Sequence, residues 1–181
     1  SWSRILKRVD ESVLLIIVEN NSAKENLTKE IVLRGIKPER LIFGERLARP
    51  EYLARYRVAD LFLDTLPYNA GTTASDALRM GLPVLTLKGS SFNSREAASV
   101  IGALNMPELI TTSFAEYERL AIELATDPEK LKVIKNKLVR NLATAPLYDT
   151  PLFTKNLESA YSEMYDRYQK GLEPDHIYVE H

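Results

Sequence analysis

Residues 61–86 read LFLDTLPYNAGTTASDALRMGLPVLT and contain a complete strand–turn–helix–strand pattern. A short apolar run at 61–65 is followed by a turn rich in Pro, Asn and Gly. Helical spacing begins near Thr72, and a second apolar run follows at 83–87. Because parallel strands are joined by crossover connections that usually contain a helix, this pattern predicts one parallel strand–helix–strand unit.

The same alternation continues on both sides of this unit. Apolar runs at 13–18 and 40–43 precede it, and a short last strand is expected at 108–111. The runs are continuous rather than alternating, as expected for strands that are buried on both faces by helices. Helical segments separate them at 23–31, before Gly35, and at 50–58 and 97–104. The sequence therefore predicts a doubly wound α/β fold with a parallel sheet.

Beyond residue 111 the chain is expected to be entirely helical. Apolar residues recur at helical spacing over 114–124, 131–142 and 151–168. Three tyrosines of the last segment, Tyr161, Tyr165 and Tyr168, are expected to be packing residues of that terminal helix and not part of a site.

Composition excludes several classes of partner. The 181 residues have a formal net charge of −1, which provides no electrostatic surface for nucleic acid or anionic lipid. No apolar run approaches the roughly 20 residues that a membrane-spanning helix needs. Cysteine is absent, which excludes disulfides and thiolate metal sites and favours a reducing compartment such as the cytoplasm. Neither nucleic acid nor membrane is an expected partner.

The turn before Thr72 is a candidate anion site. In open α/β sheets ligands bind beyond the carboxyl ends of the strands, where a helix N-terminus offers free N–H groups. Gly71 allows a phosphate to approach the backbone, and the hydroxyls of Thr72 and Thr73 can donate to its oxygens. Asp76, one turn later, is placed to hold ribose or sugar hydroxyls.

A simple helix cap explains Gly71, Thr72 and Thr73 equally well, because Asn, Gly and Thr are common capping residues. The stretch is neither a Walker A motif nor the Gly-x-Gly-x-x-Gly fingerprint of dinucleotide-binding proteins. Likewise, the Arg- and Glu-rich segment at 46–55 fits a solvated helix face.

Residues 61–86, followed by GSSFNSREAAS at 89–99, resemble the C-terminal catalytic half of O-GlcNAc transferases and SPINDLY proteins. The resemblance extends from Trp2 to His176. It implies the GT-B fold, in which two Rossmann-like domains face each other across a cleft and the C-terminal one binds the activated sugar. Residues 1–150 would form the nucleotide-sugar-binding domain, and residues 151–181 a helix and tail of the same half.

The resemblance also assigns roles to particular residues, and the donor it implies is UDP-GlcNAc. Thr72 and Thr73, with Gly71, would bind the diphosphate, and Asp76 and Arg49 the ribose. The base would meet the backbone of Leu47 and the side chains of Tyr52 and Arg55. No catalytic residue and no metal ligand is expected in this chain, and no cofactor besides the nucleotide sugar.

Two departures from the family pattern leave alternatives for the donor. Many O-GlcNAc transferases have histidine where Tyr52 and Gly71 stand here. The Ala70–Thr73 form looks more like the SPINDLY branch, some of whose members use GDP-fucose to fucosylate proteins. A nucleotide-binding module without chemistry is a further alternative, as is another GT-B enzyme.

The implied reaction is the transfer of a sugar to a Ser or Thr hydroxyl. The family's upstream lysine element, the N-terminal catalytic half and the tetratricopeptide repeats that supply protein acceptors are not within these residues. We therefore expect this chain alone to be inactive, and its implied partners are that N-terminal half and protein acceptors.

Overall fold

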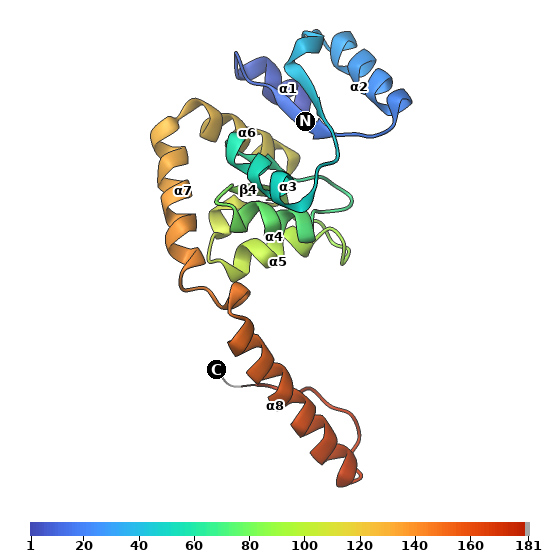
Figure 1. Ribbon diagram of the computed structural model, residues 1–181, viewed down its shortest axis with the longest axis vertical. Coiled ribbons are helices and arrows are strands. Elements are labelled where there is room, and N and C mark those ends of the chain that lie inside the picture. Colours follow the sequence, from blue (N-terminus) through green and yellow to red (C-terminus); the bar gives the residue numbers. More distant parts are fainter. Residues whose placement is uncertain (180–181) are drawn as a thin grey trace.

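A computed structural model describes residues 1–179, in which helices and parallel strands alternate (Figure 1). The strands are β1 Leu14–Ile17, β2 Leu41–Gly44, β3 Phe62–Leu63, β4 Val84–Leu87 and β5 Ile110–Thr111. The helices are α1 Trp2–Arg8, α2 Asn21–Leu33, α3 Arg49–Arg55, α4 Thr72–Arg79, α5 Glu96–Ala103, α6 Phe114–Thr126, α7 Pro128–Leu142 and α8 Thr150–Gln169. Short 3-10 turns precede β2 and β5, follow α3 and precede α8. The predicted α/β fold with parallel strands is confirmed.

The strands form two separate sheets rather than one. β1 pairs with β2 in parallel, with Leu14 opposite Leu41. The second sheet has the order β3-β4-β5, also parallel, with Phe62 opposite Val84 and Thr86 opposite Ile110. No strand pair joins the two sheets within residues 1–179.

The expectation that every strand is buried on both faces is wrong for β1. All four residues of β4 are buried, but burial alternates along β1, where Leu15 and Ile17 are 38% and 45% exposed. The reason is that Leu14 and Ile16 pack with Leu6 of α1 and other residues of one small core, which covers only one face of the two-stranded sheet.

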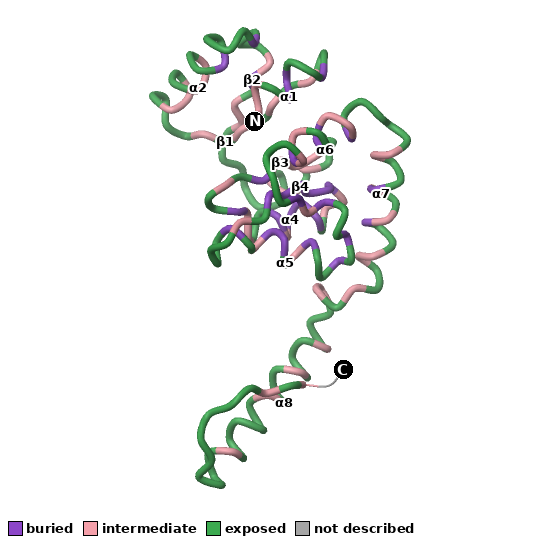
Figure 2. Tube along the Cα trace, turned by 180° about the vertical axis from the view of Figure 1, so that it is seen from behind, coloured by how far each residue is buried: buried purple, intermediate pink, exposed green. Residues whose placement is uncertain are grey.

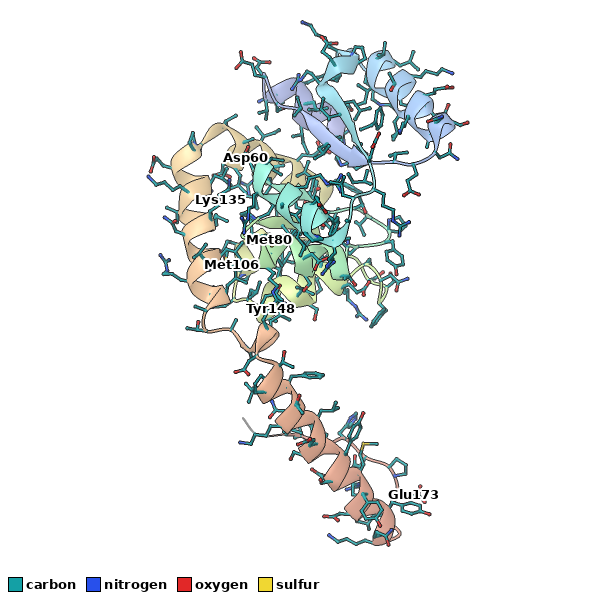
Figure 3. All side chains as sticks on the ribbon, in the orientation of Figure 1. Asp60, Met80, Met106, Lys135, Tyr148 and Glu173 are labelled. Atoms are coloured by element: carbon teal, nitrogen blue, oxygen red, sulfur yellow. The ribbon has the colours of Figure 1, made fainter. Side chains whose placement is uncertain are left out.

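The larger core surrounds β4. Helices α4, α5 and α6 all contact this strand. Figure 2 shows buried residues concentrated where these elements meet. Among the side chains less than 2% exposed are Leu78, Leu85, Ile101, Leu124 and Leu138. Helix α7 closes the other side of α6, and Lys135 on it reaches Asp60, with Nζ 3.0 Å from Oδ1 (Figure 3).

Local sequence explains where the helices begin and end. Asn20, Ser113 and Asp127 each accept a hydrogen bond from the backbone N–H three residues later, which caps α2, α6 and α7. Gly35 follows α2 with a φ of +73°, a left-handed conformation that glycine adopts without steric cost.

The three tyrosines of the terminal helix are exposed in this structure. Helix α8 leaves the globular part and extends away from it (Figure 1). Tyr161, Tyr165 and Tyr168 are 59%, 63% and 77% exposed, because no other helix or sheet covers this side of α8 within the described residues. The predicted terminal helix is confirmed as α8, and the packing of its tyrosines stays a prediction. None of the helices in residues 1–179 is both long and apolar enough to cross a membrane.

An ion pair joins α1 to the larger core. The guanidinium of Arg4 makes two hydrogen bonds to the carboxylate of Glu118 on α6, one of them 2.7 Å from Nε to Oε2. These hydrogen bonds lower the pKa of Glu118 from its ordinary value to about 2. This charge-assisted contact between α1 and α6 adds to the apolar packing of Ile5 and Val9 in the larger core.

Lowering the pH should weaken this link. Because the pKa of Glu118 is lower in the folded state, its carboxylate stabilises the fold above the ordinary pKa of 4.5, and this contribution decreases as the pH falls toward 2. Glu118→Gln should lower the free energy of unfolding at pH 7 by no more than about 1 kcal/mol, since Arg4 is largely exposed. Urea titrations should show the difference between wild type and variant shrinking from pH 5 to pH 3. An unchanged difference would contradict this assignment.

Candidate functional site

The turn between β3 and α4 is organised by Asp64, a buried carboxylate at the carboxyl end of β3 that is 5% exposed. Its Oδ1 accepts a hydrogen bond of 2.7 Å from the N–H of Ala70, and its Oδ2 accepts one of 2.6 Å from the hydroxyl of Thr86 on β4. Burial raises the pKa of Asp64, while these two hydrogen bonds oppose that rise. Asp64 thus ties the end of the turn to the neighbouring strand.

Further hydrogen bonds fix the rest of the turn. The side-chain amide of Asn69 donates to the carbonyl of Thr65 at 2.8 Å, and its backbone N–H donates to the carbonyl of Asn93 at 2.9 Å. The hydroxyl of Tyr117 on α6 donates to the carbonyl of Asp64 at 2.8 Å. The segment that leads into α4 is therefore held from several sides.

The N-terminus of α4 is open. Gly71 is its N-cap residue and has no side chain to accept the first N–H groups, in contrast to the capped starts of α2, α6 and α7. Thr72 and Thr73 are exposed in the first turn. Free N–H groups, threonine hydroxyls and the positive end of the helix dipole thus meet at one surface, which suits an anion.

Asp76, one turn along α4, is 7% exposed and faces α3. Arg49 holds its carboxylate with two hydrogen bonds of 2.8 Å, one to each oxygen. The hydroxyl of Tyr52 lies 3.2 Å from Oδ2 of the same carboxylate and 2.6 Å from the hydroxyl of Tyr56. The structure thus brings Arg49, Tyr52 and Asp76 together, although 24 and 27 residues separate Asp76 from its two partners.

Leu47 and Arg55 take no part in these hydrogen bonds. Leu47 is 42% exposed in the loop before α3. Arg55 donates from Nη1 to the carbonyl of Glu45 at 2.7 Å, so its guanidinium holds that loop and makes no hydrogen bond to Asp76. Leu47 thus belongs to the loop before α3, and Arg55 holds that loop from the end of α3. Both are candidate base-binding residues outside the Arg49–Asp76 cluster.

A pocket of about 780 Å³ opens beside the start of α4. Gly71 and Thr72 form part of its wall, together with Lys88 after β4 and with Arg95 and Glu96 at the start of α5. This places cationic and anionic side chains next to the proposed anion site, at the carboxyl edge of the sheet where ligands of open α/β folds bind.

A family model for glycosyl transferase family 41 matches residues 1–157. The chain belongs to this family. It is 33% identical over 176 residues to the UDP-N-acetylglucosamine–peptide N-acetylglucosaminyltransferase of Caenorhabditis elegans, which covers 97% of this chain. It is also 32% identical over 174 residues to the probable UDP-N-acetylglucosamine–peptide N-acetylglucosaminyltransferase SPINDLY of Petunia hybrida, which covers 94% of it.

A solved structure agrees with this membership in family 41. A mutant of the Thermobaculum terrenum O-GlcNAc transferase matches 94% of this chain with a TM-score of 0.86 and 32% sequence identity. The match confirms the predicted resemblance and the fold. The chain spans 15% of the length of the worm relative, 19% of the petunia relative and 34% of the bacterial chain.

Sequence reasoning missed several residues that shape this candidate site. Asp64 directly follows the apolar strand β3, a position that signals a role at the sheet edge, but its partner Thr86 lies on another strand. Tyr56 gave no signal in the sequence; burial and the hydrogen bond with Tyr52 raise its pKa, which keeps its hydroxyl protonated. Glu96 was also missed, because its proximity to Gly71 depends on how α4 and α5 pack.

Proposed function

We propose that this chain is the donor-binding half of a protein O-glycosyltransferase and that it binds a nucleotide sugar of the UDP-GlcNAc type. The observation that carries the proposal is the uncapped N-terminus of α4, with Gly71, Thr72 and Thr73 at the carboxyl edge of the sheet. Membership in family 41 and relatives named as UDP-N-acetylglucosamine–peptide N-acetylglucosaminyltransferases support the same donor.

The diphosphate would bind at Gly71, Thr72 and Thr73. There it would accept hydrogen bonds from the helix N–H groups and the two hydroxyls. In the full enzyme, negative charge builds on the departing nucleoside diphosphate during transfer to a Ser or Thr hydroxyl. Donors that are already fixed in place stabilise that charge without reorganisation and need no metal ion for this role.

The nucleoside would lie toward α3. The carboxylate of Asp76 accepts two hydrogen bonds from Arg49. The ribose hydroxyls would replace part of this contact by donating to the same carboxylate. The base would stack on Tyr52 and meet the backbone of Leu47, and Arg55 would hold the loop that carries Leu47. The pairing of Arg49 with Asp76 supports this assignment because its two hydrogen bonds orient the carboxylate before the ligand arrives.

Other parts of the enzyme would come from outside these residues. A facing N-terminal half would complete the cleft, and protein acceptors would bind there rather than to this chain. The absence of cysteine is consistent with a cytoplasmic enzyme.

Calorimetric titration of the chain with UDP and with GDP tests the donor site. We expect UDP to bind. The double variant Thr72→Ala, Thr73→Ala should weaken UDP binding at least tenfold, because two hydroxyl donors to an anion are lost. Thr126→Ala, at the far end of α6, is the matched control. Preference for GDP would favour a GDP-fucose donor instead. If neither nucleotide binds at millimolar concentration, even with the facing half supplied, the donor-site proposal is wrong.

A further inference from the structure

The carboxylate of Glu96 lies directly over Gly71. A Cβ atom built on Gly71 would be 2.9 Å from Oε1 of Glu96 and 3.3 Å from its Cδ. The backbone of Gly71 has a φ of −90° and a ψ of −92°, a combination outside the regions that residues with side chains favour, so this conformation suits glycine. A side chain at position 71 would also displace the Glu96 carboxylate from where it lies.

This carboxylate is half-buried yet unpartnered. Within residues 1–179, Glu96 has neither a hydrogen bond nor an ion pair. Two cations, Lys88 and Arg95, line the same pocket, but neither forms an ion pair with Glu96 or with another described residue. A partly desolvated carboxylate whose oxygens are all free is a strong acceptor for donors that a ligand brings.

The pocket has room for a ligand group beyond a phosphate. Its volume is about 780 Å³, and it extends from Gly71 and Thr72 past Glu96 to Ser99 on α5. A diphosphate on the N-terminus of α4 would occupy only the Gly71–Thr72 end. The group attached to that diphosphate would then lie next to the Glu96 carboxylate.

We propose that Glu96 binds the sugar of the donor by accepting hydrogen bonds from its hydroxyl groups. The inference rests on the proposed function, because it requires the diphosphate to bind at Thr72 and Thr73. A carboxylate suits a pair of hydroxyls, since each of its two oxygens accepts independently. Lys88 and Arg95 offset the repulsion between Glu96 and the diphosphate.

The negative charge of Glu96 determines which class of sugar the site should bind. Glu96 favours a neutral sugar with free hydroxyls and disfavours a uronic acid, whose carboxylate would face a like charge close by. The site should therefore discriminate between UDP-GlcNAc and UDP-glucuronic acid.

Calorimetric titrations with UDP, UDP-GlcNAc and UDP-glucuronic acid test this in wild type, Glu96→Ala, Glu96→Gln and the surface control Glu25→Gln. We expect wild type to bind UDP-GlcNAc more tightly than UDP. Glu96→Ala should reduce the affinity of UDP-GlcNAc relative to UDP about tenfold, as expected for the loss of a hydrogen bond to a charged group. The same variant should bind UDP at least as well as wild type does. Glu96→Gln should bind UDP-glucuronic acid more tightly than wild type does.

The outcomes separate this inference from the proposed function. One outcome is that wild type binds UDP in a way that depends on Thr72 and Thr73, but Glu96→Ala leaves the affinity of UDP-GlcNAc relative to UDP unchanged. The proposed role of Glu96 is then wrong, and the donor site stands. The absence of any advantage in wild type would also overturn the role of Glu96. If wild type binds no nucleotide at millimolar concentration even with the facing half supplied, both proposals fail. Circular dichroism of each variant shows whether it is folded.

Discussion

Asp64→Ala should lower the free energy of unfolding by roughly 2–4 kcal/mol and weaken UDP binding at least tenfold. The substitution removes the acceptor of the Ala70 N–H and of the Thr86 hydroxyl, and Thr86 is fully buried. Each buried polar group left without a partner costs about 1–3 kcal/mol. Binding weakens as well, because Ala70 immediately precedes Gly71 and the turn loses the contact that positions it.

Asp64→Asn is the matched comparison. Its amide oxygen can still accept from the Ala70 N–H, and its amide nitrogen can donate to the Thr86 hydroxyl, which is both a donor and an acceptor. We expect this variant to retain stability within about 1 kcal/mol. Urea unfolding followed by circular dichroism, with calorimetry for UDP, measures both effects. A loss below 1 kcal/mol in Asp64→Ala would show that Asp64 does not hold the turn.

Leu85→Ala should destabilise the larger core by about 3 kcal/mol. Leu85 lies on β4, is 0% exposed and belongs to the core that α4, α5 and α6 enclose. Truncating a fully buried leucine removes its burial energy and leaves a cavity that the surrounding close-packed side chains fill only in part.

Leu33→Ala provides the control, because Leu33 is 79% exposed at the end of α2 and its truncation should change stability by less than about 0.5 kcal/mol. The free energy of unfolding of both variants comes from urea titration. Equal, small effects in the two variants would mean that β4 does not form the centre of the core.

Much of the fold was predictable from local pattern. The apolar run at 83–87 predicted β4, and the helix after Thr72 was placed correctly as α4. The end of α2 before Gly35 followed from the φ angle that glycine tolerates. Such features depend on residues a few positions apart, so a sequence read alone contains the necessary information.

The candidate site was predictable only as a set of residues. Family resemblance selected Arg49, Tyr52 and Asp76, but their mutual hydrogen bonds are visible only in the structure. The N-terminus of α4 was recognised from Gly71 and the threonines after it. The turn that leads into it depends on Asp64 and Thr86, which are on different strands.

The sequence by itself determined the order of strands and helices along the chain, the family and where α4 begins, because these follow from periodicity, turn residues and motifs along the chain. Only the tertiary structure decided that one face of β1 is exposed, that the apolar stripe of α8 lies uncovered and that Glu96 lies over Gly71. These properties depend on how elements far apart in the chain pack against one another, and packing depends on the shapes of all the surfaces involved rather than on any local pattern.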